Sequence, residues 1–263
     1  MSEKSLHILF IADIVGRPGI DVVAGLLPGL KKSHAVDLCI ANGENADGGN
    51  GLTEAIARQL FSLGVDVITG GNHTWGNSQF RSYLDSTQKV LRPLNYPPQA
   101  PGRGSTIILT SRQIPVGVLN LQGRTFMYPI DCPFRTGHEE VARLREKTPI
   151  ILVDFHAEAT AEKAALAWYL DGAVSAIIGT HTHVQTADER IMPKGTAFIT
   201  DVGMTGPHDS VIGMDAQVAI KRFTTVLPEK YRMASANIRL NGALIEIDSS
   251  SGRAQRITRI NVP

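Results

Sequence analysis

The side chains best suited to chemistry in this sequence follow five separate apolar runs, each at the point where the run ends. They are carboxylates, amides and imidazoles, namely Asp13, Glu44, Asn45, Asn72, His156, His181 and His183. Carboxylate oxygen, amide oxygen and neutral imidazole together suit iron, manganese or zinc. No cysteine belongs to the set, which argues against a structural zinc cluster. The sequence therefore predicts a transition-metal site built from the ends of several strands.

Two features of the set indicate a pair of metal ions. His181 and His183 are separated by one residue, and such a pair at a strand end can present one imidazole to each of two ions. A single carboxylate can bridge ions that lie roughly 3.5–4 Å apart, the separation used by two-metal hydrolases. Glycines such as Gly43 and Gly71 let the nearby backbone turn tightly and approach a ligand closely.

Each of these residues also has an ordinary explanation when it is taken alone. An Asp at a strand end often caps the following turn, and Asn tolerates the left-handed backbone of turns. A single histidine is more often a hydrogen-bonded structural residue than a ligand, and we interpret His7, His34 and His138 in that way. We place His208 on a loop and interpret Arg17 as an exposed turn residue. Metal binding is inferred from the set as a whole.

The elements that must position these residues are short apolar runs that alternate with helical patterns. Continuous apolar character predicts strands covered on both faces. The expected strands are 6–12, 36–41, 65–69, 150–155, 173–178 and 197–200. The expected helices are 20–33, 53–63, 78–85, 137–147, 160–171 and 214–223, and the expected hairpins pair 105–111 with 116–121 and 236–248 with 253–260. In open α/β sheets ligands bind beyond the carboxyl ends of the strands, where the polar residues fall.

Local signals refine the helix predictions. Pro28 lies inside the first helical pattern and is expected to kink or shorten that helix. Thr136-Gly-His-Glu139 has the spacing of a capping box, and Thr160 is the expected N-cap of the following helix. Neither a repeat nor an interdomain linker is seen, so residues 1–263 are expected to form a single domain.

Composition excludes several classes of protein. Of 263 residues, 43% are hydrophobic and 19% are charged, as in globular proteins and unlike disordered ones. The 26 Lys and Arg nearly balance the 25 Asp and Glu, so neither a broadly basic nucleic-acid surface nor a membrane-seeking face is expected. Cys39 and Cys132 are too few for a disulfide framework. Without a membrane-spanning apolar stretch or a signal-peptide layout, a cytoplasmic location is predicted.

The order of these motifs resembles that of the calcineurin-like metallophosphoesterases. The motifs are Asp13, Gly43-Glu-Asn45, Gly71-Asn-His73, His156 and Gly179-Thr-His-Thr-His183. Three longer stretches are similar to the YmdB-like branch, bacterial 2′,3′-cyclic nucleotide phosphodiesterases: Asn42-Gly-Glu-Asn-Ala-Asp-Gly-Gly49, Gly71-Asn-His-Thr-Trp75 and His156-Ala-Glu-Ala-Thr160. The resemblance runs from Ile11 to about Gly213. It implies an α/β fold of the metallophosphoesterase type, a four-layer αββα sandwich with mixed sheets flanked by helices.

The resemblance also implies which residues hold each metal ion. One ion would be held by Asp13, Glu44, Asn45 and His183, and the other by Glu44, Asn72, His156 and His181. The broad superfamily usually has His where Val15 stands, Asp where Glu44 stands, and an acidic residue where Thr74 stands. The YmdB-like branch shares these changes, and Asn45 compensates there for the missing imidazole.

A mechanism and a substrate follow from the same resemblance. A hydroxide that bridges the metals would attack phosphorus, and His73 would protonate the leaving ribose oxygen as the general acid. The substrate would be a small phosphodiester such as a 2′,3′-cyclic nucleotide, and stable nucleic-acid binding is not expected. The cofactors would be two divalent or trivalent transition-metal ions, iron first, with manganese or zinc as alternatives. The resemblance further suggests a homo-oligomer.

Other functions and roles stay open at the level of sequence. The same metal site could serve a phosphomonoesterase or an RNA-directed phosphoesterase, or a regulatory binding protein in which the metal has no catalytic duty. Asp154 and Glu158 flank His156 and could either orient ligands or be ordinary surface or capping carboxylates. Trp75 and Phe126 could stack on a base, with core packing as the alternative.

Overall fold

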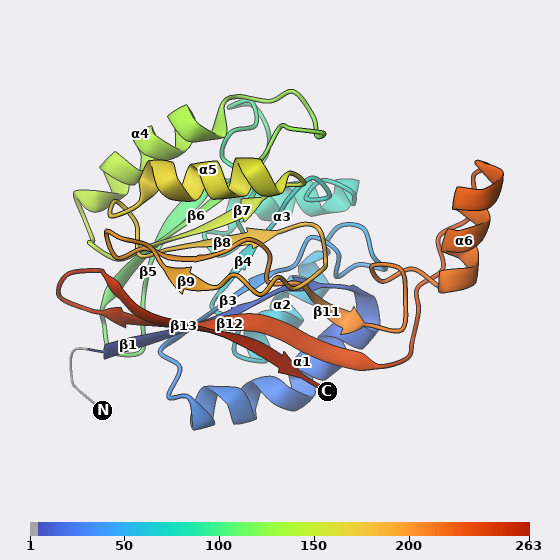
Figure 1. The fold of residues 1–263 in the computed structure, drawn as a ribbon, viewed down its shortest axis with the longest axis horizontal. Helices are drawn as coiled ribbons and strands as arrows, with labels where there is room; N and C mark the ends of the chain where they lie inside the picture. Colours follow the sequence, from blue (N-terminus) through green and yellow to red (C-terminus); the bar gives the residue numbers. More distant parts are fainter. Residues whose placement is uncertain (1–4) are drawn as a thin grey trace.

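Two β-sheets lie face to face in the computed structural model, which describes residues 5–263, and helices cover the outer face of each sheet (Figure 1). The first sheet contains β1 (Ser5–Ile11), β2 (Asp13–Ile14), β3 (Leu38–Asn42), β4 (Val67–Thr69), β11 (Met204–Pro207), β12 (Ile238–Asp248) and β13 (Ala254–Val262). The second contains β5 (Ser105–Leu109), β6 (Pro115–Gln122), β7 (Ile151–His156), β8 (Ala176–Thr180), β9 (Arg190–Ile191) and β10 (Ala197–Ile199). The helical elements are α1 (Gly16–Ser33), α2 (Glu54–Ser62), η1 (Ser78–Phe80), α3 (Arg81–Ser86), α4 (Pro133–Arg145), α5 (Thr160–Leu170) and α6 (Ala216–Thr225).

Both sheets mix parallel and antiparallel pairs. The first has the order β2-β11-β12-β1-β3-β4, with β13 paired to β12, and the second has the order β5-β6-β7-β8-β10-β9. β1, β3 and β4 are parallel to one another, as are β6, β7, β8 and β10. Both expected hairpins form, as β5–β6 and β12–β13. The predicted four-layer sandwich with mixed sheets is therefore confirmed.

Alternating side chains of the buried strands divide between two apolar layers. On β1, Ile8 and Phe10 join the cluster between the sheets, where Leu152 of β7 also lies. Leu9 and Ile11 point the other way and pack with residues of α1 and α2. A third cluster lies between the second sheet and α4 and α5. Because both faces are covered, these strands read as continuous apolar runs in the sequence.

The first helix differs from its prediction in two ways. α1 begins at Gly16, four residues before the expected start, without a side-chain N-cap that the sequence could have revealed. It also runs unbroken past Pro28 to Ser33, so the expectation that Pro28 shortens the helix was wrong. Proline costs a hydrogen bond and crowds the preceding turn. Packing of the apolar face of α1, including Val23 and Leu27, against the first sheet outweighs that cost.

One helix start and one N-cap residue were placed wrongly from capping signals. α4 begins at Pro133 rather than at the Thr136 capping box, because proline is pre-organised for the first helical position. The N–H of Thr136 already donates to the carbonyl oxygen of Cys132 inside the helix. α5 begins at Thr160, so Ala159 occupies the N-cap position that was assigned to Thr160.

The carboxyl ends of the two parallel blocks meet at one edge of the sandwich. Asn42, the last residue of β3, donates its side-chain amide to the carboxylate of Asp154 on β7 over 3.1 Å. α6 instead lies away from the layers, on an arm that projects from the body (Figure 1). In residues 5–263 no helix combines the length and the apolar character needed to cross a membrane. The first four residues, on which the absence of a signal-peptide layout partly depends, lie outside this range.

Candidate metal centre

All seven predicted ligands lie at this edge, at the ends of strands from both sheets. Asp13 opens β2 directly after β1, and Glu44 and Asn45 occupy the turn after β3. The other four come from the ends of three strands: Asn72 follows β4, His156 is the last residue of β7, and His181 and His183 follow β8. The topology therefore brings residues from distant parts of the sequence to one place.

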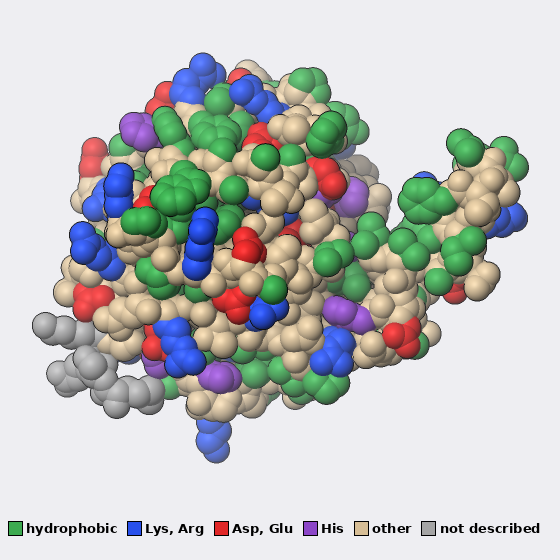
Figure 2. Space-filling view, in the orientation of Figure 1, with side chains coloured by type: hydrophobic (Ala, Val, Ile, Leu, Met, Phe, Trp, Pro, Cys, Tyr) green, Lys and Arg blue, Asp and Glu red, His purple; other side chains and the backbone are tan. Residues whose placement is uncertain are grey.

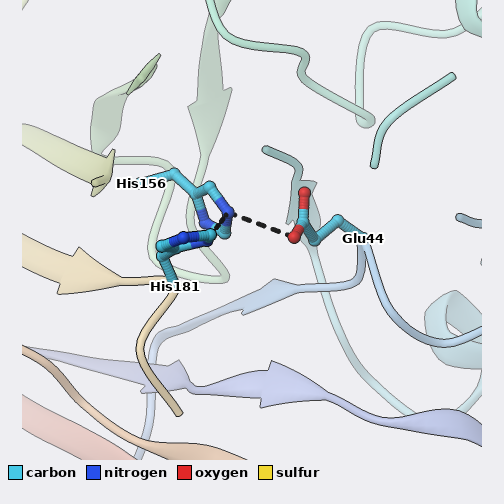
Figure 3. Close-up of side chains that lie close together, drawn as sticks. All are labelled: Glu44, His156 and His181. Atoms are coloured by element: carbon cyan, nitrogen blue, oxygen red, sulfur yellow. Dashed lines mark hydrogen bonds and ion pairs between the residues drawn. The ribbon is translucent and has the colours of Figure 1, made fainter. Parts of the chain in front are cut away.

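Three residues form the centre of the site: Glu44, His156 and His181 (Figure 3). Nε2 of His156 lies 3.1 Å from Oε1 of Glu44, 3.0 Å from Nδ1 of His181 and 3.0 Å from Oδ1 of Asn72. A single proton on Nε2 cannot satisfy three such neighbours at once. Gly71 permits this approach, because a side chain there would collide with both His156 and Glu44. The atoms converge as the ligands of one cation would.

A second group lies beside the first. Nε2 of His183 is 3.3 Å from Oδ2 of Asp13 and 3.2 Å from Nδ2 of Asn45. Nδ2 of Asn45 is in turn 3.4 Å from Oε1 of Glu44, so the Glu44 carboxylate lies between the two groups. The predicted ligands therefore lie in two groups of contacts, with the Glu44 carboxylate between them.

Asp13 gives the clearest indication that the centre suits a cation. Its side chain is fully buried, and within residues 5–263 neither carboxylate oxygen has a hydrogen-bond partner. A buried carboxylate that lacks hydrogen-bond partners carries a large desolvation cost. A metal ion held together with Asn45 and His183 would offset that cost, so the donor set fits a metal at this position.

The electrostatics of the first group are dominated by the close approach of acid and imidazole. Burial alone would raise the pKa of Glu44, but the charge and hydrogen bond of His156 and the hydrogen bond of His73 hold that pKa well below its usual value. Burial would lower the pKa of His156, yet the carboxylates of Glu44 and Asp13 raise it to about 9. Burial and the charge of His156 lower the pKa of His181 to about 3. His181 is therefore neutral at pH 7, the form that binds metals, whereas His156 is protonated and must release its proton when a metal binds.

The imidazole of His156 is oriented from behind by a buried chain of hydrogen bonds. Its Nδ1 lies 2.9 Å from Oγ1 of Thr180, and that hydroxyl donates to Oδ1 of Asp154 over 2.7 Å. Asp154 is buried, so the alternative that it is a surface carboxylate is wrong. Burial raises the pKa of Asp154 to about 7. Glu158 is about half exposed, and its Oε2 lies 3.1 Å from Nε2 of His181.

The turn that carries His181 and His183 is held by residues that sequence reasoning missed. Both histidines have positive φ angles, 103° and 64°, which are costly for residues with a side chain. Between them, Thr182 donates its N–H and its hydroxyl to Oδ2 of Asp201 over 3.0 and 2.8 Å. Nζ of Lys163 donates to the same oxygen over 2.7 Å, and both charged side chains are fully buried. A lysine inside a helical pattern carries no signal that it will be buried opposite an aspartate.

His73 lies beside the centre and is partly exposed. Its backbone N–H donates to Oε2 of Glu44 over 2.8 Å, and its ring Nδ1 lies 2.7 Å from Oδ1 of Asn45. Thr74, which stands where the superfamily has an acidic residue, closes the turn through hydrogen bonds to the backbone of Gly71. Asn45 therefore orients the His73 ring in this chain.

The structure also locates four other residues that were interpreted from the sequence. Arg17 is exposed, but it lies in α1 and pairs with Asp21 rather than standing in a turn. Trp75 packs with its ring centroid 4.5 Å from that of Tyr96, which favours its structural role. His208 lies on the loop after β11, as expected. Phe126 is 89% exposed, so core packing is the wrong explanation for it.

Comparison with known proteins identifies relatives over nearly the whole chain. A family model described as YmdB-like protein matches residues 9–260. The chain is 49% identical to the 2′,3′-cyclic-nucleotide 2′-phosphodiesterase of Bacillus subtilis (strain 168), in an alignment that covers 97% of this chain and 96% of the relative.

Solved structures agree with the fold. A protein of Thermus thermophilus, described as hypothetical, superposes with a TM-score of 0.92 at 40% identity, over 98% of this chain and all of that chain. A structure described as a novel phosphatase of Mycoplasma pneumoniae also gives a TM-score of 0.92, at 34% identity, over 98% of this chain and 93% of the other.

Proposed function

The chain belongs to the YmdB-like family, and on that basis we propose that it is a metal-dependent phosphodiesterase that hydrolyses 2′,3′-cyclic nucleotides or similar small phosphodiesters. The observation that carries this proposal is the convergence of carboxylate, amide and imidazole donors around Glu44, with the buried carboxylate of Asp13 left without a hydrogen-bond partner in residues 5–263. The name of the Bacillus subtilis relative supports the choice of substrate.

Two transition-metal ions would be held by the two groups of ligands that share Glu44. The first group is Asp13, Glu44, Asn45 and His183, and the second is Glu44, Asn72, His156 and His181. When bound, such ions supply an activated water as the nucleophile and offset negative charge on the phosphoryl oxygens. Iron stays the first prediction for their identity, with manganese and zinc as alternatives.

His73 is proposed to donate a proton to the departing ribose oxygen. Oδ1 of Asn45 accepts the proton on Nδ1, which leaves Nε2 to carry the proton that is transferred. The Asn45 oxygen has two lone pairs, so it can hold His73 and still serve as a ligand. The partial exposure of the ring gives a substrate access to it.

Replacement of His73 tests this role. For His73→Ala we expect normal metal content and a fall in kcat of about 10²–10⁴ on 2′,3′-cyclic AMP, because general acid catalysis supplies that much. The fall should be much smaller on bis(p-nitrophenyl) phosphate, since nitrophenolate leaves without protonation. An equal fall on both substrates, or undiminished turnover of the cyclic nucleotide with a full complement of metal, would reject the assignment.

We also propose that residues 1–263 form one catalytic domain that assembles as a homo-oligomer. One apolar cluster joins both sheets, which supports a single domain. Figure 2 shows hydrophobic side chains gathered on the projecting arm of α6, where Phe223, Val226 and Leu227 are exposed. A ten-residue helix is marginal alone in water, and a second copy would present the same apolar patch in a two-fold interface. The cytoplasmic location stays a prediction.

A further inference from the structure

A pocket of about 350 Å³ opens directly beside the candidate metal centre. Asn72 and His181 form one wall. The other wall is made by four consecutive residues, Phe126 to Pro129, from the loop between β6 and α4, drawn in green at the top of Figure 1. The size is that of a small-ligand site. One side of the pocket can therefore hold a group that is attached to a phosphate at the metals.

The two aromatic side chains of this loop face solvent. Phe126 is 89% exposed and Tyr128 is 67% exposed, so neither contributes its ring to the apolar core. Phe126 also has a φ angle of 62°, a left-handed conformation that is costly for a bulky side chain. Hydrophobic exposure and backbone strain both disfavour the free folded state, and strain of this kind gathers at functional sites.

The base of the loop is held firmly against the centre. The N–H of Gly123 donates to the carbonyl oxygen of His156 over 2.9 Å. The N–H groups of Arg124 and Thr125 donate to the carboxylate of Glu162 on α5 over 3.1–3.2 Å. A side chain at Gly123 would collide with Glu162, so the close approach requires glycine. The distance from the aromatic rings to the metal ligands is thereby restrained.

We propose that Phe126 and Tyr128 bind the planar aromatic group of the substrate, the nucleobase of a cyclic nucleotide, and so determine specificity. This inference rests on the proposed phosphodiesterase function. Aromatic faces stack on every base, so the loop would favour nucleotides over phosphodiesters without a ring while discriminating little among bases. The loop holds the substrate and takes no part in the chemical step.

The test compares two five-membered cyclic phosphodiesters, 2′,3′-cyclic AMP and glycerol 1,2-cyclic phosphate, which has no base. For Phe126→Ala in the metal-loaded full chain, we expect the KM for 2′,3′-cyclic AMP to rise about 10-fold, while kcat stays within about two-fold of the parent value. Phe126→Tyr should restore KM, and kcat/KM for the glycerol compound should not change. Leu109→Ala removes an exposed apolar side chain on β5, which does not line the pocket, and should leave both substrates unaffected.

Two results would overturn the inference. An unchanged KM for 2′,3′-cyclic AMP in Phe126→Ala and Tyr128→Ala would show that the rings do not touch the base. An equal loss on both substrates would show that the loop only supports the metal centre. If the parent protein fails to hydrolyse 2′,3′-cyclic AMP, the proposed function is rejected, and the role of the loop needs a test of its own. Adenosine 3′-monophosphate and glycerol 2-phosphate are then titrated separately into the protein by calorimetry. Equal affinities of the parent protein for the two compounds would reject base binding by the loop.

Discussion

At the scale of single residues, the candidate metal centre contains a buried carboxylate whose hydrogen-bonding capacity the protein alone does not satisfy. Asp13 is buried without a hydrogen-bond partner in residues 5–263, and the nearest imidazole nitrogen, Nε2 of His183, is 3.3 Å from Oδ2. A buried carboxylate without hydrogen bonds weakens the folded state unless a cation offsets its charge. The stability of the protein should therefore depend on metal through this one side chain.

Asp13→Asn separates the cost of the buried charge from the stabilisation by bound metal. Without metal, we expect its melting temperature to equal or exceed that of the parent protein, because the variant removes a buried charge and keeps the shape. With Mn²⁺ at about 100 times the dissociation constant of the parent, each bound ion should stabilise the parent by about 2.7 kcal/mol. The variant should lose most of the stabilisation that comes from the ion held by Asp13. Thermal unfolding with and without Mn²⁺ measures both quantities.

The control for that experiment is Asp21→Asn, which removes an exposed carboxylate paired with Arg17. It should melt like the parent protein and respond fully to Mn²⁺. A metal response in Asp13→Asn equal to that of the parent would show that Asp13 is not a ligand.

At the scale of elements, the turn after β8 shows how a buried ion pair can position the proposed metal ligands. Oδ2 of Asp201 accepts from Thr182 and Lys163, and the turn holds His181 and His183 in left-handed backbone conformations. Loss of the lysine would leave Asp201 with an uncompensated buried charge. Breaking such a pair costs about 3–5 kcal/mol.

Lys163→Met should therefore lower the free energy of unfolding by about 3–5 kcal/mol and also weaken metal binding. Urea denaturation and metal titration measure the two effects. The matched control is Arg259→Met, which breaks a partly exposed pair with Glu189 and should cost only about 0–1 kcal/mol. Metal affinity that stays normal in a destabilised Lys163→Met would show that the turn does not need the ion pair.

Comparison of these elements with their predictions shows which structural features a sequence pattern can predict. Continuous apolar runs predicted the main strands, because burial on both faces determines composition directly. Short strands such as β2 and β11 were missed, since two to four residues have no period. Helix starts failed where the true start lacked a side-chain cap, as at Gly16, or where proline served instead, as at Pro133.

The candidate site was predictable for a related reason. Ligand types recur at strand ends, and parallel strands bring those ends together whatever the loops do. The supporting contacts were not predictable, because they join side chains through tertiary structure. Neither the 2.7 Å contact of Asn45 with His73 nor the burial of Lys163 against Asp201 has any signature in the order of residues.

At the scale of the whole molecule, we propose that the arm of α6 is the surface through which copies assemble. Phe223 is 81% exposed and Val226 is 87% exposed, and water disfavours both. Phe223→Ser together with Val226→Ser should weaken association at least about 10-fold, because both side chains would leave an apolar interface, and should leave the circular dichroism spectrum unchanged. Light scattering over a range of protein concentrations measures the mass. Leu109→Ser, on β5, is the control for an exposed apolar residue outside the arm.

A parent protein that stays monomeric at every concentration would contradict assembly through α6. A variant that keeps the mass of the parent would show that the interface lies elsewhere.

The most direct test of the whole account joins metal content to turnover in one preparation. Protein is treated with a chelator, its metal content is measured, and hydrolysis of 2′,3′-cyclic AMP is followed as Mn²⁺ or Fe²⁺ is returned. We predict that activity disappears on chelation and returns as the content rises to two ions per chain. Full turnover by metal-free protein would contradict the account.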